Sequence, residues 1–256
     1  MRPHACARAH CANPKTPTNA GACHALSVSI FKLKPKNADT PNVSQTYPTM
    51  TRTKAINMDC MDYMQTLPDK AFQLAIVDPP YGLDQKSTQG AGKLKNRELN
   101  KGKIAQRWDT APTEEYFKEL RRVSENQIIW GGNYFDLPPC RCFVCWDKCQ
   151  PWPNFSQAEF AWTSFDKPAK IFHFDNRCKK IHPTQKPVEL YGFLINTFAK
   201  QGDRILDTHL GSGSSRIAAH RLGFDFVGIE IDKEYYDASV ERFERECKQQ
   251  PTIFDL

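Results

Sequence analysis

The sequence predicts an α/β fold in which a mostly parallel, twisted β-sheet carries helices on both faces. Short apolar runs typical of buried strands alternate along the chain with segments of helical periodicity. One apolar run ends at a pair of prolines and another at a glycine loop, and both are strong chain breakers. Strands that alternate with helices imply parallel pairing and a sheet covered on both faces. A chain of 256 residues is long enough for one such domain with modest additions.

The first half of this pattern holds four predicted strands and one predicted helix. Residues 72–77 are an apolar run that two prolines end, because proline cannot continue a central strand. Residues 113–123 are predicted to be a helix, with Thr113 as its cap and apolar side chains recurring on one face. Residues 127–130 form another buried strand, which a glycine pair stops. Further strands are expected at residues 142–147 and 158–163.

The second half repeats the alternation. Pro187 opens a helix with an apolar side, and Gly202 is expected to end it. Residues 204–207 then form a strand that leads into a glycine loop and a further helix. Residues 225–230 form the next strand, and Asp232 caps the last helix. The apolar stripe of that helix consists of Tyr236, Val240, Phe243 and Cys247.

Residues 1–49 differ in character from the rest of the chain. They are rich in Pro, Ala, Thr and Asn, and they contain no apolar run that could anchor a core. We therefore expect a disordered extension at 1–49, followed by one domain over residues 50–256. No apolar stretch is long enough to span a membrane and no segment resembles a signal peptide, so the expected location is the cytoplasm.

Ten cysteines are many for a cytoplasmic protein, where disulfides are not the default. Four of them are close together in the sequence, at positions 140, 142, 145 and 149, and would suit a zinc knuckle. Because a strand is predicted through this segment, alternate side chains would point to opposite faces. We therefore predict buried thiols and no metal site, and the seven histidines show no ligand pattern either.

A glycine loop between a strand and a helix, at residues 207–215, predicts a site for a nucleoside-containing cofactor. Gly211 and Gly213 allow a tight turn and a close approach of the ligand to the backbone. Glu230 ends the next strand, at a spacing that lets a carboxylate accept hydrogen bonds from ribose hydroxyls. Arg216 stands where a dinucleotide fingerprint needs its third glycine, which disfavours a nicotinamide oxidoreductase.

The tetrapeptide Asp78-Pro79-Pro80-Tyr81 suits methylation of an aromatic amino group. The nitrogen of such a group is a poor nucleophile because its lone pair is delocalised into the ring. The Asp78 carboxylate and the Pro79 carbonyl can each accept a hydrogen bond from one N–H of the amino group. The prolines fix the backbone turn that presents these oxygens. Tyr81 offers a flat face for a base extruded from the duplex, and such stacking contributes roughly 1–3 kcal/mol.

A basic loop follows this tetrapeptide and predicts contact with double-stranded DNA. Residues 85–107 hold seven basic side chains against one acidic one, a net charge of +6. The expected DNA contacts are Lys86, Lys93, Lys95, Arg97, Lys101, Lys103 and Arg107. A second basic segment, at about 164–181, is the other candidate for target recognition, and the small size of both suggests a short recognition site.

Four segments in this order resemble the amino-methylating DNA methyltransferases. They are Asn57-Met58-Asp59-Cys60, Asp78-Pro79-Pro80-Tyr81, His182-Pro183-Thr184-Gln185-Lys186-Pro187 and the loop Asp207 to Ser215. The catalytic tetrapeptide precedes the cofactor loop, which is the permuted, β-type arrangement of that family. The resemblance covers about residues 55–245 and implies a Rossmann-like methyltransferase fold that uses S-adenosylmethionine.

The resemblance also implies a role for each matching residue. Asp78 and Pro79 would bind the target amino group, Asp59 the cofactor adenine and Glu230 its ribose, while Thr184 and Lys186 would approach its carboxylate. Expected cofactor contacts are Asp59, Cys60, Thr184, Lys186, Asp207, His209, Gly211, Ser212, Gly213, Ser214, Glu230 and Asp232. Thr208 and His209 depart from the family's Pro-Phe. His209 either takes over the packing role, which we favour, or forms a hydrogen bond with the cofactor.

The predicted function is site-specific methylation of adenine N6 in duplex DNA, because Asp78 stands where cytosine-N4 enzymes more often carry serine. Two alternatives stay open: a cytosine-N4 enzyme, and a DNA-binding relative that has lost catalysis. A homodimer and a cognate restriction enzyme are also open, and a membrane partner is not expected. The resemblance would place the protein with the nucleoid of a bacterial cell.

Overall fold

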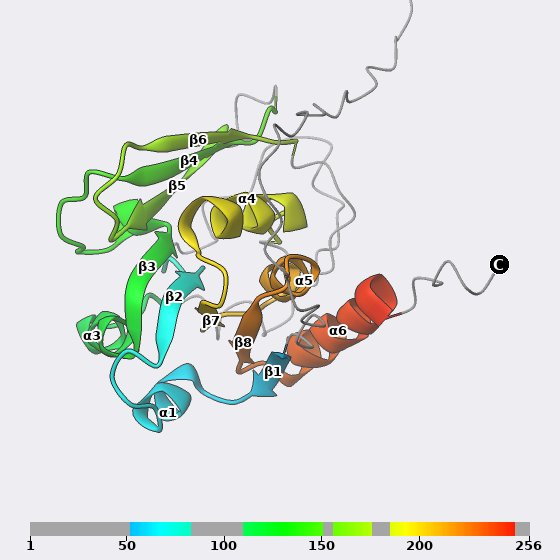
Figure 1. Cartoon of the computed structure of the whole chain (residues 1–256). Coiled ribbons are helices and arrows are strands. Elements are labelled where there is room, and N and C mark those ends of the chain that lie inside the picture. Colours follow the sequence, from blue (N-terminus) through cyan, green and yellow to red (C-terminus); the bar gives the residue numbers. More distant parts are fainter. Residues whose placement is uncertain (1–51, 83–109, 151–155, 176–184, 249–256) are drawn as a thin grey trace, which may run out of the picture. The chain divides into compact units, whose positions relative to one another are not determined.

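The computed structural model describes residues 52–82, 110–150, 156–175 and 185–248 of the chain. Within these residues, eight strands form one sheet in the order β1-β8-β7-β2-β3-β5-β4-β6 (Figure 1). The strands are β1 Thr53–Asn57, β2 Phe72–Val77, β3 Ser124–Trp130, β4 Phe143–Asp147, β5 Ala158–Thr163, β6 Lys170–His173, β7 Arg204–Asp207 and β8 Asp225–Glu230. The α-helices are α1 Cys60–Gln65, α3 Glu114–Val123, α4 Val188–Phe198, α5 Ser214–Arg221 and α6 Lys233–Phe243.

The sheet is mostly parallel, as predicted. Strands β1, β8, β7, β2 and β3 pair in parallel with their neighbours, and β5 is antiparallel to both β3 and β4. Strand β6 pairs in parallel with β4 and forms an edge of the sheet. The carboxyl ends of the five parallel strands therefore meet along one edge, where open α/β sheets bind their ligands.

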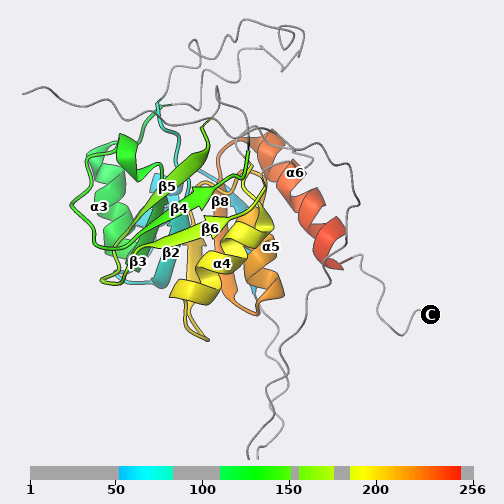
Figure 2. The same ribbon diagram turned by 90° about the horizontal axis from the view of Figure 1, so that it is seen from above.

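Helices cover both faces of the parallel part, as predicted (Figures 1 and 2). On one face, Leu74 and Ile76 of β2 belong to a core that includes residues of α4 and α5. On the other face, Ala75 and Val77 pack with residues of α1 and α3. The apolar run of β2 is continuous because both faces of a central parallel strand are buried.

Most predicted elements agree with the structure to within a few residues, but the end of one helix differs. Gly202 does not end α4, which stops at Phe198, with Ala199 as its cap. Gly202 lies instead in the turn before β7, where its φ of +92° suits a glycine. Thr113 occupies the N-cap position of α3 as predicted, although its side chain makes no capping hydrogen bond. Sequence patterns locate elements better than their exact ends, because ends depend on tertiary contacts.

Several predictions fall wholly or partly outside the described residues. These are the extension at 1–49 and the basic loop at 85–107 with all seven of its predicted DNA contacts. The second basic segment is described as far as residue 175 and contains β6. Among the described helices, none is long and apolar enough to cross a membrane.

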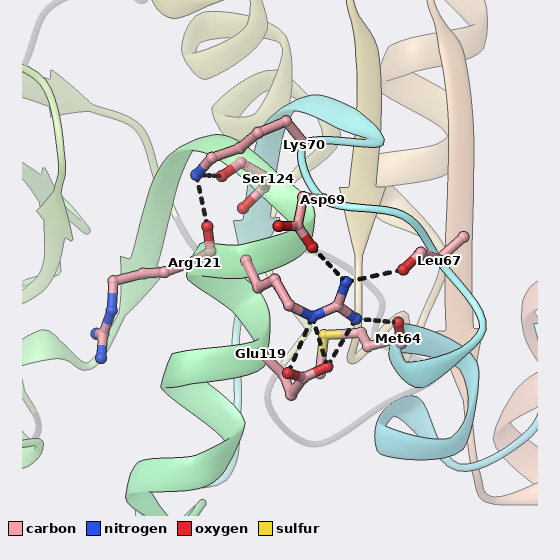
Figure 3. Close-up of polar contacts among 8 residues, drawn as sticks. Met64, Leu67, Asp69, Lys70, Glu119, Arg121 and Ser124 are labelled. Atoms are coloured by element: carbon pink, nitrogen blue, oxygen red, sulfur yellow. Dashed lines mark hydrogen bonds and ion pairs between the residues drawn. The ribbon is translucent and has the colours of Figure 1, made fainter.

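Arg122 ties α3 to α1 and to the loop that follows α1, through contacts with residues that Figure 3 labels. Its guanidinium donates to the carbonyls of Met64 and Leu67, each at 2.8 Å, and to the carboxylates of Asp69 and Glu119. A planar guanidinium has several N–H donors, so it can bond to carbonyls that one lysine ammonium cannot reach at the same time. The cluster fixes the end of α1 that lies away from the predicted cofactor motif at residues 57–60.

Arg122→Lys is expected to lower the melting temperature by a few degrees, because two backbone carbonyls lose their donor. Circular dichroism on heating measures this effect. Arg121→Lys is the matched control, since the Arg121 side chain points away from the cluster in Figure 3. An equal change in both variants would show that the guanidinium contacts of Arg122 are not what stabilises the α1–α3 pairing.

Candidate active site

The predicted catalytic and cofactor segments meet at the carboxyl edge of the parallel strands. Asp78 directly follows β2, Asp207 ends β7, and Glu230 ends β8. Strand β7 lies between β8 and β2 in the sheet, so the three carboxylates occupy adjacent strand ends. Asp78 and Glu230 also both raise the pKa of Asp207 by electrostatic repulsion. The sheet thus brings together the residues that the sequence places at the two halves of one site.

Both carboxylate oxygens of Asp78 have partners within the protein. The Tyr81 hydroxyl donates to Oδ1 at 2.7 Å, and the Lys186 ammonium contacts Oδ2. Burial raises the pKa of Asp78, and the positive charge of Lys186 opposes that rise. Lys186 is itself buried, with 2% of its side chain exposed. The resemblance implies that Lys186 approaches a cofactor carboxylate, but here its ammonium lies between Asp78 and Glu159.

Glu159 of β5 is a charged member of this group that the sequence analysis did not identify. Its Oε2 lies 3.1 Å from the Lys186 ammonium, and its Oε1 lies 2.5 Å from that of Lys148. Burial by itself raises the pKa of Glu159, but the two lysines outweigh it and lower that pKa to about 2. Both carboxylates likewise hold the pKa of Lys186 above its usual value, against the effect of burial. Lys186 and Glu159 therefore stay charged at neutral pH.

The Tyr81 ring lies in a tight aromatic setting next to Gly131. It stacks on Tyr134 with ring centroids 5.0 Å apart, and Phe135 meets it edge-on at 6.1 Å. A Cβ atom on Gly131 would lie 2.2 Å from the Tyr81 ring, and the φ of Gly131 is +68°. Only glycine fits there, because a side chain would both clash and strain the backbone. Tyr134 is 49% exposed and was also missed, although it follows the strand-ending glycine pair in the sequence.

The glycine loop leads into α5 and forms a hydrogen bond with the Glu230 carboxylate. The Glu230 carboxylate accepts hydrogen bonds from the backbone N–H of Gly211 at 2.8 Å and of Asp232 at 2.9 Å. Gly211 and Gly213 both have positive φ, and Gly213 is the N-cap of α5. Each Glu230 oxygen accepts one described hydrogen bond, so each retains acceptor capacity for a ligand hydroxyl. These acceptors suit the ribose hydroxyls of a nucleoside cofactor.

Asp207 and His209 lie beneath this loop. Asp207 accepts from the Ser215 hydroxyl at 2.6 Å and from the His209 backbone N–H at 3.0 Å, and burial raises its pKa to about 7. The His209 ring meets Tyr116 edge-on at 5.4 Å, and its Nδ1 lies 2.9 Å from the Thr208 hydroxyl. Burial lowers the pKa of His209 to about 4, so the ring is neutral. These contacts are the packing arrangement expected for His209.

The other predicted cofactor residues have structural contacts of their own. Asp59 and Asp232 cap α1 and α6 through their side chains. The segment before α1 lies beside β8, since the Met58 backbone N–H donates to the Glu230 carbonyl at 3.1 Å. The Cys60 thiol stays protonated, because burial raises its pKa to about 12.

The serines of the loop pack against α6. The hydroxyls of Ser212 and Ser214 lie 3.2 Å apart, and Arg242 of α6 donates to the Ser212 carbonyl and the Ser214 hydroxyl. Thr184 lies outside the described residues.

The cysteines predicted to be buried thiols differ in their exposure. Cys142 is buried, Cys140 and Cys145 are partly buried, and Cys149 is exposed, so that prediction is wrong for Cys149. Cys149 lies instead near Asp147 and His173, with the candidate ligand atoms of the three within 4.8 Å of one another. Asp147 and His173 already pair at 2.9 Å, which gives these two a role without a metal.

Comparison with known proteins matches the part of the chain that carries this site. Residues 130–241 match the model of a DNA methylase family, N6_N4_Mtase. The Type II methyltransferase M.HinfI of Haemophilus influenzae is 26% identical, over 77% of this chain and 70% of its own length. The Type II methyltransferase M2.MboI of Moraxella bovis is also 26% identical, over 72% and 85%.

A solved structure described as PvuII DNA methyltransferase (cytosine-N4-specific) has the same fold. It superposes with a TM-score of 0.52 at 16% identity, covering 76% of this chain and 87% of its own. The chain is thus similar in sequence to DNA methylases that modify amino groups, and it has a Rossmann-like methyltransferase fold.

Proposed function

We propose that the protein methylates the N6 amino group of adenine in duplex DNA, with S-adenosylmethionine as methyl donor. The observation that carries this proposal is the position of Asp78. Its carboxylate lies at the end of β2, and β7 alone separates that strand from β8 and Glu230. A methyl donor held by Glu230 and the glycine loop would share one sheet edge with a base held by Asp78.

The residues of this chain supply acceptors and an aromatic surface. The Asp78 carboxylate and the Pro79 carbonyl would each accept a hydrogen bond from one N–H group of the target amino group, which would orient its nitrogen lone pair. S-adenosylmethionine, when bound, would supply an electrophilic methyl group, with a neutral thioether as the product of its transfer. Asp78 would accept the proton that the nitrogen gives up on methylation. The Tyr81 and Tyr134 rings provide the stacking surface for the base.

Glu230→Gln is expected to weaken S-adenosylmethionine binding by roughly tenfold or more, as loss of a charge-assisted hydrogen bond predicts. The substituted amide nitrogen would also face a backbone N–H, either that of Gly211 or that of Asp232. Isothermal titration calorimetry measures the dissociation constant. Glu234→Gln, an exposed carboxylate in the first turn of α6, is the matched control. Unchanged affinity in Glu230→Gln would remove Glu230 from the cofactor site.

Adenine is proposed over cytosine because the first position of the tetrapeptide is an aspartate. The cytosine-N4 reaction needs the same two acceptors and the same sheet edge, and it is the second candidate. A chain that binds DNA without catalysis is the third. The intact carboxylates of Asp78 and Glu230 argue against it, since a pure binding module needs neither at these strand ends.

The substrate class is tested by methyl transfer to different polymers. The full chain is incubated with labelled S-adenosylmethionine and either mixed-sequence duplex DNA or structured RNA at equal nucleotide concentration. Label in the DNA and not in the RNA is the expected result. Label confined to RNA would overturn the DNA assignment. No label in either polymer, with cofactor binding intact, would contradict the proposed activity.

A further inference from the structure

The Glu159 carboxylate has a buried acceptor that is paired with a charge but not well aligned for a hydrogen bond. Among the described residues, its Oε2 forms an ion pair with the Lys186 ammonium 3.1 Å away, without the geometry of a hydrogen bond. The ammonium is instead directed to Asp78 Oδ2, with which it forms a hydrogen bond. A buried acceptor without a well-aligned hydrogen bond destabilises the fold and calls for an explanation. A second position of the Lys186 ammonium, in which it bonds to Glu159, would give one.

Asp78 is occupied in this arrangement by groups of its own chain. Tyr81 holds Oδ1 and Lys186 holds Oδ2, where a target amino group must donate. An ionised carboxylate has further lone pairs. However, an ammonium bound to one oxygen makes the carboxylate a weaker hydrogen-bond acceptor for the target amino group. Productive binding of a base therefore favours movement of Lys186 away from Asp78.

The positive charge of the buried Lys186 ammonium needs a negatively charged partner in every position that the side chain adopts. Only 2% of its side chain is exposed, and an unpaired buried ammonium is strongly destabilising. Among the described residues, Lys186 also donates to the Tyr81 hydroxyl at 3.4 Å, but Glu159 Oε2 is the charged acceptor within reach besides Asp78. Lys148 on Oε1 balances the second negative charge. Two carboxylates and two ammonium groups thus make a neutral cluster, with Lys186 between the carboxylates.

We propose that Glu159 is a positioning residue that receives the Lys186 ammonium when a target amino group enters and releases Asp78 to accept it. The proposal rests on the proposed methyltransferase function. Glu159 would touch neither base nor cofactor. It would act through Lys186, by setting how strongly that ammonium competes for Asp78.

The charge of Glu159 has a predictable effect on Asp78. Among the described residues, the groups that interact with Asp78 include Lys186, Glu159, Tyr81, Tyr116, Tyr191 and Asp207. Burial is the main reason that the pKa of Asp78 is raised, Glu159 raises it further, and Lys186 lowers it. Removing the Glu159 charge therefore lowers the pKa of Asp78, both directly and by leaving Lys186 to Asp78 alone. Removing the Lys148 charge raises it.

The experiment measures the titration of Asp78 in the full chain by carbon-13 NMR of labelled aspartate carboxyls, assigned with Asp78→Asn. In Glu159→Gln, the Asp78 midpoint is expected to move to lower pH, and in Lys148→Met to higher pH. Asp166→Asn, which removes an exposed carboxylate, should leave it unchanged. This readout does not need methyl transfer, so it stands whether or not the proposed function holds.

Kinetics give the second readout. Glu159→Gln should lower kcat by roughly tenfold, as expected for a misplaced catalytic group, while KM for DNA stays nearly constant because phosphate contacts dominate DNA binding. The acid limb of the kcat profile should move to lower pH, and Glu159→Asp should restore part of kcat. Identical Asp78 midpoints in wild type, Glu159→Gln and Lys148→Met would overturn the proposal. If Glu159→Gln does not fold, the Lys148→Met midpoint alone decides, and a shift to lower pH or no shift contradicts it.

Discussion

Replacing Asp78 with asparagine is expected to lower kcat by roughly 10²–10⁴-fold, the range for loss of a group that handles a proton in the reaction. Asparagine keeps the size of the side chain and one carbonyl acceptor, but it loses the negative charge that attracts the amino protons. It also leaves Lys186 with Glu159 as its one remaining carboxylate. Single-turnover methylation of duplex DNA measures the effect on the chemical step directly.

Cofactor affinity separates a catalytic role of Asp78 from a structural one. Asp78→Asn should bind S-adenosylmethionine within about threefold of wild type, because a residue that acts at the transition state contributes little to ground-state binding. Asp237→Asn, which removes an exposed carboxylate paired with Lys233 on α6, is the matched control and should keep full activity. A fully active Asp78→Asn protein would show that another residue accepts the amino group.

Gly131→Ala is expected to be the most disruptive single-methyl change near the site. The added Cβ would lie 2.2 Å from the Tyr81 ring, at a backbone φ of +68°. Overpacking and a left-handed backbone together cost roughly 2–5 kcal/mol of unfolding free energy. Tyr81 would have to leave its stack on Tyr134, so methyl transfer should fall as well. Urea denaturation measures the stability change.

Gly192→Ala provides the control for this substitution. Gly192 lies within α4, a Cβ there meets nothing within 4 Å, and the residue does not have a positive φ. Alanine in a helix interior is favoured over glycine by about 1 kcal/mol, so Gly192→Ala should keep or increase stability. Wild-type stability of Gly131→Ala would mean that the Tyr81 ring is not held against Gly131.

The parts of the site that could be predicted from sequence are those with strong local signals. Strand β2 is a continuous apolar run because both of its faces are buried, and the two prolines place Asp78 at its end. The glycines of the loop mark a backbone with positive φ, and the spacing to Glu230 follows from one helix and one strand. Asp232 was recognisable as a cap because aspartate before a helix satisfies free N–H groups.

The parts that could not be predicted depend on contacts between distant segments. Glu159 sits in an ordinary strand pattern, and nothing local distinguishes it from a solvated carboxylate. It reaches Lys186 only because β5 pairs antiparallel with β3 beside the active edge. Tyr134 gains its contact with Tyr81 from a short 3₁₀ turn after β3. Gly202 was predicted to end α4, but that helix ends earlier, where Ala199 adopts an extended backbone.

The most direct test of the central claim is the identity of the methylated nucleoside. The full chain is incubated with mixed-sequence duplex DNA and S-adenosylmethionine that carries a deuterated methyl group, and the digested nucleosides are identified by mass spectrometry. The expected product is N6-methyladenine with the deuterated label, absent when Asp78→Asn replaces the wild type. Deuterated N4-methylcytosine would keep the mechanism and move the target base. Label on a ring carbon, or no labelled nucleoside from a protein that binds the cofactor, would contradict transfer to an amino group at Asp78.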